Sequence, residues 1–530
     1  MTEQKQKSVI FIMADQMAAC HVNCYGSGVP STPTLDALAA RGTRFDRCYA
    51  TSPVCTPNRA VMLSGRSPVV SGMISNNFTM VPDTATYAQV LGAQGYRVGG
   101  FGKFHVCPMP LPHPESYEFL GFHESVITED PKWGAYTEWI RREHPEHFDT
   151  ALAVAWGDAR MKRPFPDSRY ESENVRAVRN RILQPLRENS PWRCFYTSPL
   201  PPELHQTTWI TSQALDFMKR QTAGDRERPF FCHVSYVDPH DPYDPPQPYD
   251  RLFRPQDMPD PAPAAWRREG NSVLEDGRRG LGFDEIAENV DAIRQLRAHY
   301  HGSIRFIDDQ IARIVDFVEA GNLWDDVVIL FTTDHGEMLG DHELITKGVK
   351  PYDAGIRCPL IVAGGGVQAQ QNRRLTCTLD FFPSFCDWAG VPVEVRPHLE
   401  GRSFAPVCSG EKDPRPWSSV QVAFGPMETV VGDDGWRLTL FRGDDSPNQL
   451  VDLNSDPLEQ ENRYADPACL DKRRHLFEEM VEHSVRIRTT PQHRNLPVVE
   501  GQKRTPGGNG NGQLLNPIPR YTDPTGIPEW

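Results

Sequence analysis

The feature that most constrains the fold of this chain is a set of short apolar runs that each stop at a polar residue. The run Val9–Met13 is followed by Asp15, and the run Val327–Phe331 is followed by Asp334. Both runs are continuous and rich in β-branched and aromatic residues, which is typical of strands buried on both faces of a parallel sheet. Open α/β sheets place their sites beyond the carboxyl ends of such strands. We therefore expect Asp15 and Asp334 to lie at one edge of a sheet.

Runs of this kind alternate along the chain with segments of helical pattern. The predicted strands are Val9–Met13, Tyr96–Gly100, Pro229–Tyr236, Val327–Phe331 and Leu360–Val362. The predicted helices include residues 31–41, which Gly42 ends, and residues 290–320, whose isoleucines recur on one face. Lys103 and His240 also follow predicted strands. The alternation predicts an α/β fold with a large, mostly parallel central sheet flanked by helices.

The chain has 530 residues, too many for one small core, so we expect more than one domain. Residues 1–400 are predicted to form the catalytic α/β domain. Short segments such as Gly435–Leu440 predict a smaller antiparallel subdomain over residues 401–498. The tail, residues 499–530, is rich in Gly, Asn and Pro, so we expect it to be irregular. It is a candidate contact surface in a homo-oligomer.

The formal net charge of −14 argues against a nucleic-acid partner, which requires a basic face. It also means that an anionic substrate must be drawn by a local basic pocket. The N-terminal apolar run is too short to span a bilayer and does not resemble a signal peptide. We therefore expect a cytoplasmic protein without membrane contact. Its twelve cysteines are then expected to be reduced thiols.

The segment Ser52–Arg59 combines a cysteine, a proline and an arginine at close spacing. Pro57 is pre-shaped for the first turn of a helix, which would deliver Cys55 to the helix N-terminus with Arg59 one turn later. A helix N-terminus attracts anions, and a guanidinium adds a forked hydrogen-bond donor. Cys55 is therefore a candidate nucleophile in a site suited to a tetrahedral oxyanion.

A second motif, Asp334-His335-Gly336, follows a predicted strand. Taken alone, it is more typical of a capping aspartate and a surface histidine. Together with Asp15 and Cys55, it indicates a cation site. Hard cations such as Ca²⁺ prefer several oxygens, whereas an imidazole ligand shifts the preference toward Mn²⁺ or Zn²⁺.

The pattern Cys-x-Pro-x-Arg, followed by Leu63-Ser64-Gly65-Arg66, resembles the signature of the type I sulfatases of the alkaline phosphatase superfamily. The resemblance implies that a formylglycine-generating enzyme oxidises Cys55 to formylglycine, whose hydrate attacks sulfur. It also implies one divalent cation, Ca²⁺ first, with Mn²⁺ and Zn²⁺ left open. The implied metal ligands are Asp15, Gln16, Cys55 as formylglycine, Asp334 and His335. Gln16 stands where many members have a second aspartate, as it does in choline-sulfatase-like and phosphonate-monoester-hydrolase-like branches.

Further residues resemble the family's substrate-binding and catalytic positions. Gly102-Lys103-Phe104-His105 is similar to the family's Gly-Lys-Trp-His, which implies that Lys103 holds a sulfate oxygen and that His105 is the base that expels sulfate. Lys347 matches a second sulfate-binding lysine, and either the proline-flanked His240 or Lys347 would assist departure of the leaving oxygen, His240 by protonating it. Arg59 would stabilise the anionic oxygens. A lone Lys-x-His would more often be a surface lysine and a core histidine, but here it lies at a strand end after glycines.

The cysteine–histidine cluster of Cys20, His21 and Cys24 could suggest zinc. Because no matching second pair exists, buried thiols are expected there instead.

The predicted activity is hydrolysis of a small anionic sulfate monoester to an alcohol and inorganic sulfate. Sugar, choline and aryl sulfates all remain open as the substrate. One alternative is a phosphonate monoester or phosphodiester hydrolase on the same scaffold, and another is a non-catalytic protein that binds sulfated ligands. Lys103 and His105 favour the sulfatase, since the phosphonate branch tends to lack that pair.

Overall fold

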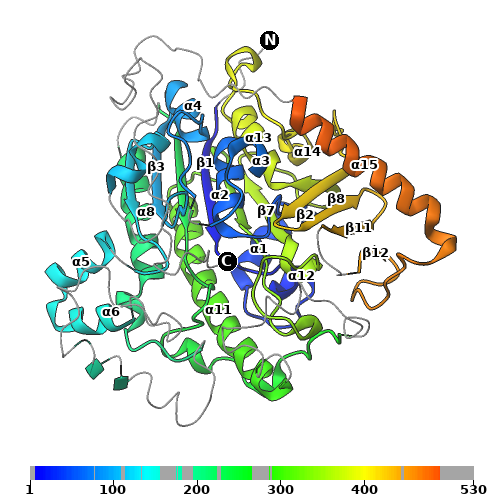
Figure 1. Ribbon diagram of the computed structural model, residues 1–530. Coiled ribbons are helices and arrows are strands. Elements are labelled where there is room, and N and C mark those ends of the chain that lie inside the picture. The colour runs from blue at the N-terminus through cyan, green and yellow to red at the C-terminus, as the bar shows by residue number, and fades with distance from the viewer. Residues whose placement is uncertain are drawn as a thin grey trace, which may run out of the picture. The chain divides into compact units, whose positions relative to one another are not determined.

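An eight-stranded sheet forms the centre of the chain (Figure 1). The computed structural model describes residues 6–489 apart from 77, 109–113, 133, 155–174, 176, 179, 182–194, 224–227, 265–285, 287–288 and 443–446. Within this part, the strand order is β4-β3-β5-β1-β6-β7-β2-β8. The strands are β1 Ser8–Ala14, β2 Thr43–Tyr49, β3 Arg97–Gly102, β4 Glu124–Ile127, β5 Phe230–Ser235, β6 Val327–Thr333, β7 Arg357–Gly364 and β8 Gln370–Cys377. All five predicted strands are present.

The sheet is mostly parallel because only β7 runs against its neighbours, β6 and β2. β1 lies between β5 and β6 and pairs in parallel with both. The register places Ala14 opposite Thr333, so the chain leaves both strands at the same edge. Parallel pairing therefore brings together polar residues that are far apart in the sequence.

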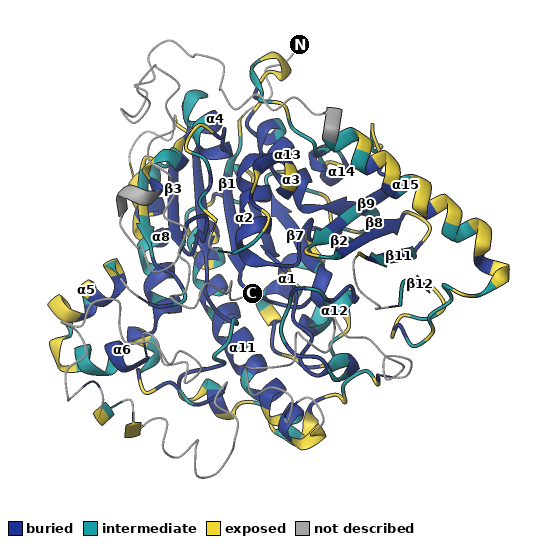
Figure 2. Cartoon of the chain, viewed as in Figure 1, coloured by how far each residue is buried: buried dark blue, intermediate teal, exposed yellow. Residues whose placement is uncertain are grey.

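Two layers of helices cover the sheet, and side chains of β1 point alternately to each layer. Ile10 and Ile12 pack with α1, α8 and α11, whereas Phe11 and Met13 pack with α2, α4 and α13. The bounds are α1 Pro33–Arg41, α2 Cys55–Ser64, α3 Pro68–Ser71, α4 Tyr87–Ala93, α5 Ala135–Glu143, α6 Phe148–Val154, α8 Gln206–Thr222, α11 Val290–Ala320, α12 Asp353–Ile356, α13 Phe381–Trp388 and α14 Ala405–Cys408. Figure 2 shows the strands buried and the outer helix faces exposed. The predicted helices at 31–41 and 290–320 correspond to α1 and α11.

A second sheet of four antiparallel strands follows, in the order β12-β11-β10-β9. Its strands are β9 Ser419–Phe424, β10 Met427–Gly432, β11 Trp436–Phe441 and β12 Gln449–Asp452. Helix α15, Leu470–Thr489, packs Leu476 and Met480 against this sheet. The α/β class with a smaller antiparallel C-terminal sheet is confirmed. The division at residue 400 stays a prediction, and the predicted tail at 499–530 lies outside the described residues.

Two smaller expectations can be compared with the structure. Cys20 and Cys24 are partly exposed, so the expectation that they are buried was wrong. They lie in the short 3-10 turns Ala19–His21 and Asn23–Tyr25, which do not bury either cysteine side chain fully. No helix within the described ranges combines the length and apolar character needed to cross a bilayer.

Candidate active site

Two carboxylates end neighbouring strands at one edge of the large sheet. Asp15 follows β1, Asp334 follows β6, and both are fully buried. Asp334 Oδ1 accepts a hydrogen bond from the backbone N–H of Gln16 at 3.0 Å, which ties the two strand ends together. The sequence pattern of buried runs ending in aspartate thus translates directly into two adjacent acidic side chains.

Cys55 is the first residue of α2 and is 1% exposed. The turn before it is held by Asn58, whose Oδ1 accepts hydrogen bonds from the Thr51 N–H at 3.1 Å and the Thr378 hydroxyl at 2.7 Å. The amide of Asn58 also donates to the backbone carbonyl of Asp334. The predicted helix N-terminus is present, and Asn58 fixes it onto the end of β6.

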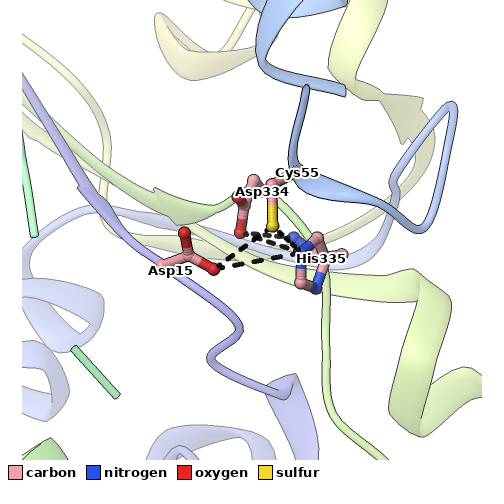
Figure 3. Close-up of side chains that lie close together, drawn as sticks. All are labelled: Asp15, Cys55, Asp334 and His335. Atoms are coloured by element: carbon pink, nitrogen blue, oxygen red, sulfur yellow. Dashed lines mark hydrogen bonds and ion pairs between the residues drawn. The ribbon is translucent and has the colours of Figure 1, made fainter. Parts of the chain in front are cut away.

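Four buried side chains converge at this edge: Asp15, Cys55, Asp334 and His335 (Figure 3). One donor atom from each lies within 4.8 Å of the others. Cys55 Sγ lies 3.1 Å from His335 Nε2 and 3.8 Å from Asp15 Oδ1. His335 Nδ1 lies 3.0 Å from the Gly336 carbonyl, to which it donates, so Nε2 turns its lone pair toward the group. Burial lowers the pKa of His335, which keeps the imidazole neutral and able to coordinate.

This donor set fits a divalent cation. Two carboxylates are ordinary ligands for Ca²⁺, Mn²⁺ or Zn²⁺, the imidazole favours Mn²⁺ or Zn²⁺, and an oxygen at position 55 would suit a hard cation better than sulfur does. Among the described residues, this is the one group of at least three such side chains placed to hold a metal ion.

Gln16, the fifth predicted ligand, is oriented differently. Its side-chain oxygen accepts a hydrogen bond from Lys347 Nζ, and its amide nitrogen donates to Glu337. Its backbone adopts a positive φ of 62°. Gln16 therefore links the metal-site candidates to Lys347, and its oxygen faces the lysine.

Two buried cations neutralise the carboxylates. Arg59 Nε lies 2.8 Å from Asp334 Oδ2, and Arg59 Nη2 lies 3.0 Å from Asp15 Oδ2. Lys103 Nζ lies 2.5 Å from the same Asp15 oxygen. Burial alone would raise the pKa of Asp15, but Lys103 and Arg59 hold that pKa well below its usual range. Asp15 thus directs one oxygen to the cationic side chains and the other toward Cys55 and His335.

His240 and Lys347 form the outer part of the site. Their side-chain nitrogens, Nε2 and Nζ, are in hydrogen-bond contact. His240 Nδ1 lies 2.7 Å from the Asp241 carbonyl, so it donates there and leaves Nε2 facing the site. Burial and Lys347 lower the pKa of His240, but the carboxylates of Asp241, Asp130 and Asp15 outweigh them and raise it to about 9. The raised pKa allows the imidazole to be protonated at neutral pH, but Nε2 can hold a proton only when Lys347 Nζ has left it for another acceptor, because an ammonium group and an N–H cannot donate to each other.

His105 has the opposite character. Burial, followed by the charge of Lys103, lowers its pKa to about 3, so its ring is neutral. Among the described residues, neither ring nitrogen has a hydrogen-bond partner, although the side chain is buried. Its unused nitrogens are placed to accept a hydrogen bond from a bound molecule, but a pKa this low makes the ring a weak base.

The structure adds three residues that sequence reasoning missed: Asn58, Glu129 and Asp130. Asn58 lies inside the cysteine motif, where its spacing to Arg59 gave no separate signal. Glu129 and Asp130 follow β4, a four-residue strand too short to be recognised by its pattern. The polar run 128–130 after Val126-Ile127 is the signal that could have indicated them.

The fold and this site define an α/β enzyme with a candidate metal centre at the carboxyl edge of its sheet. The family model described as Sulfatase matches residues 7–391. The chain therefore belongs to the sulfatase family of hydrolases, within the alkaline phosphatase superfamily.

Relatives match along most of their length. An arylsulfatase of Clostridium perfringens is 26% identical over 483 residues, covering 86% of this chain and 89% of the relative. A choline-sulfatase of Rhizobium meliloti is 25% identical over 470 residues, covering 87% and 83%. The multifunctional alkaline phosphatase superfamily protein PehA of Trinickia caryophylli is 28% identical over 513 residues, covering 87% and 92%. The solved phosphonate monoester hydrolase of Agrobacterium radiobacter shares the fold, with a TM-score of 0.71, 23% identity and coverage of 91% and 96%.

Proposed function

We propose that this chain hydrolyses a sulfate monoester to an alcohol and inorganic sulfate, using a formylglycine made from Cys55. The observation that carries the proposal is the position of Cys55. It starts a buried helix, faces two carboxylates and an imidazole, and lies one helical turn from Arg59. A nucleophile at this position would meet an anionic substrate beside the cationic side chains of Arg59, Lys103 and Lys347.

Each side chain of the site has a task in this reaction. Hydrated formylglycine would supply one hydroxyl to attack sulfur and a second whose deprotonation drives sulfate release. A bound divalent cation, Ca²⁺ first and Mn²⁺ or Zn²⁺ next, would lower the pKa of the attacking hydroxyl and offset charge on the transferring group. Lys103 and Lys347 would hold the sulfate oxygens.

The two histidines would move protons in opposite directions. As the ester S–O bond breaks, its electron pair goes to the leaving oxygen, which takes the proton from His240 Nε2. The raised pKa of His240, about 9, supplies that proton at neutral pH. His105 is neutral, and the charge of a bound sulfate group beside it would have to raise its pKa from about 3 before the ring removes the proton that sulfate release requires.

A phosphonate monoester or phosphodiester hydrolase is the second candidate. It is favoured by the similarity to PehA, whose name describes a multifunctional protein, and by the Agrobacterium phosphonate monoester hydrolase fold. Lys103 and His105 support the sulfatase. Lys103 is held by the Asp15 oxygen that Arg59 also contacts, and both ring nitrogens of His105 are without a hydrogen-bond partner among the described residues.

The test begins with maturation. The chain is co-expressed with a formylglycine-generating enzyme, and the mass of the peptide that contains Cys55 establishes its conversion. The converted protein is then assayed on aryl, choline and sugar sulfates, and in parallel on phenylphosphonate monoesters and phosphodiesters. We expect a sulfate ester to be the best substrate. A dominant phosphonate rate would select the second candidate, and an intact thiol without turnover would indicate a binding protein.

A further inference from the structure

The short loop after β4, residues 128–132, runs beside the Lys103–His105 segment. β3 and β4 pair in parallel so that Ile127 lies opposite Gly102, and the N–H of Thr128 donates to the Gly102 carbonyl at 3.1 Å. This β4 loop is thus an extension of the sheet edge on which the candidate site is built. The β4 loop lies beside the Lys103–His105 segment because β3 and β4 pair, although the two segments are about 25 residues apart in the sequence.

The β4 loop connects two sides of the site. Glu129 Oε1 accepts the backbone N–H of His105 at 2.9 Å, where the chain adopts a positive φ of 46°. Lys132 Nζ lies 2.9 Å from Asp244 Oδ2, and both side chains are buried. One end of the loop therefore holds the segment that carries Lys103 and His105, and the other end holds the segment that follows His240.

Asp130 lies between these two anchors and faces both functional cations. Its Oδ1 forms an ion pair with Lys103 Nζ, and its Oδ2 lies 4.0 Å from His240 Nε2. Burial raises the pKa of Asp130, but Lys103 and His240 outweigh this and lower it to about 2, so the carboxylate is charged. Its side chain is 19% exposed, whereas Lys103 is fully buried. Asp130 thus stands at the outer limit of the buried site.

We propose that Asp130 is a positioning residue that holds the oxyanion-binding Lys103 and the leaving-group acid His240 on one shared carboxylate. Lys103 receives a second carboxylate partner besides Asp15, which fixes its ammonium between two anions. His240 receives an anion beside Nε2, the nitrogen that would give up its proton. This inference rests on the proposed hydrolysis, and it assigns to Asp130 a role in releasing the alcohol.

The experiment uses converted enzyme and a series of aryl sulfates from 4-nitrophenyl to phenyl sulfate. Because a general acid matters most when the leaving group is poor, Asp130→Asn should lower kcat/KM about 100-fold for phenyl sulfate and less than about tenfold for 4-nitrophenyl sulfate. Asp130→Glu, which keeps the charge, should recover much of the loss on phenyl sulfate. Glu118→Gln, which removes an exposed carboxylate on a nearby turn, should leave both rates unchanged.

The outcomes separate this inference from the proposed function. An equal loss on every ester in Asp130→Asn, or no loss, would overturn the role of Asp130 while the wild type remained a sulfatase. If Asp130→Asn does not fold, a flat loss across the series in Asp130→Glu would overturn it equally. A wild type that turned over only the matching aryl phosphonates would overturn the sulfatase proposal alone, and the same leaving-group comparison would then be made on that series. A wild type that turned over neither series would overturn both.

Discussion

The inner and outer halves of the candidate site are built by different means. The inner half, Asp15, Cys55, Asp334 and His335, is fixed by strand ends and a helix N-terminus, and all four side chains are buried. The outer half, His240, Lys347 and Asp130, is fixed by contacts between loop side chains, and His240 and Asp130 are 14% and 19% exposed. The halves meet at Lys103, which contacts Asp15 on one side and Asp130 on the other.

This difference separates two kinds of demand. The inner half holds like charges together in a buried place, where backbone placement and buried cations support it. Under the proposed function, the outer half would admit a substrate and release an alcohol, and it is built from contacts between loop side chains. We therefore expect changes in the inner half to affect both stability and chemistry, and changes in the outer half to affect chemistry selectively.

The largest effect is expected from removing the nucleophile. Under the proposed function, Cys55→Ala should lower kcat by roughly four orders of magnitude or more, because it removes the residue that would form the covalent bond to sulfur. The free energy of unfolding should also fall, by roughly 1 kcal/mol, because the lost sulfur is buried. Steady-state kinetics on a sulfate ester would measure this loss. The control Cys469→Ser, in the C-terminal part of the chain, should retain full activity, and equal loss in both variants would contradict the assignment.

Removal of Arg59 tests whether the inner half depends on charge compensation. Arg59→Met would leave Asp15 and Asp334 with less compensation in a buried site, at a cost of about 3–5 kcal/mol in the free energy of unfolding. Because a bound cation would replace part of the missing charge, added Ca²⁺ should stabilise this variant more than it stabilises the wild type. Urea unfolding with and without Ca²⁺ measures both effects. A loss below about 1 kcal/mol would mean that the carboxylates tolerate each other without Arg59.

The outer half should determine the alkaline limit of activity. The pKa of His240 is raised to about 9, so its acid form is present at neutral pH and is lost as the pH rises through that value. Turnover of phenyl sulfate should therefore fall above about pH 9, whereas 4-nitrophenyl sulfate should be less affected. In His240→Gln, phenyl sulfate turnover should drop about 100-fold and lose this alkaline limb, with thermal stability close to wild type. An unchanged limb would assign it to another group.

The smallest expected effect concerns the support of Cys55. Asn58→Ala removes hydrogen bonds to Thr51, Thr378 and the Asp334 carbonyl, and we expect a loss of roughly 1–3 kcal/mol in the free energy of unfolding. Activity should fall by about tenfold, because the helix start would be less well fixed relative to β6. A variant that lost activity without losing stability would place Asn58 in direct contact with substrate.

The inner half could be predicted from the sequence because its information is local. Asp15 and Asp334 follow continuous apolar runs, and the cysteine, proline and arginine near position 55 lie within one helical turn of one another. Strands at the sheet margins gave weaker signals. β2 carries Arg44, Asp46 and Arg47 among its apolar residues, so its sequence does not show the pattern of a buried strand. It is a strand because it pairs with β7 and β8.

The outer half depends on information that no local pattern contains. Asp130 reaches Lys103 only because β4 pairs with β3, and Gln16 faces Lys347 only because a distant loop returns to the end of β1. The resemblance to the sulfatases suggested Gln16 as a ligand, but its orientation depends on partners more than 300 positions away. Residue patterns together with the family resemblance therefore named side chains that the structure brings close together, but they did not give the contacts between them.

The deep burial of Cys55 has a consequence for the order of events in the life of the chain. Conversion requires access to this thiol, yet in the folded protein the thiol is 1% exposed at the first residue of α2. Under the proposed function, oxidation of Cys55 must precede the packing of α2. The converted fraction of the protein then depends on the rate of modification relative to the rate of folding. Slower synthesis or folding would then yield a larger active fraction from the same amount of polypeptide.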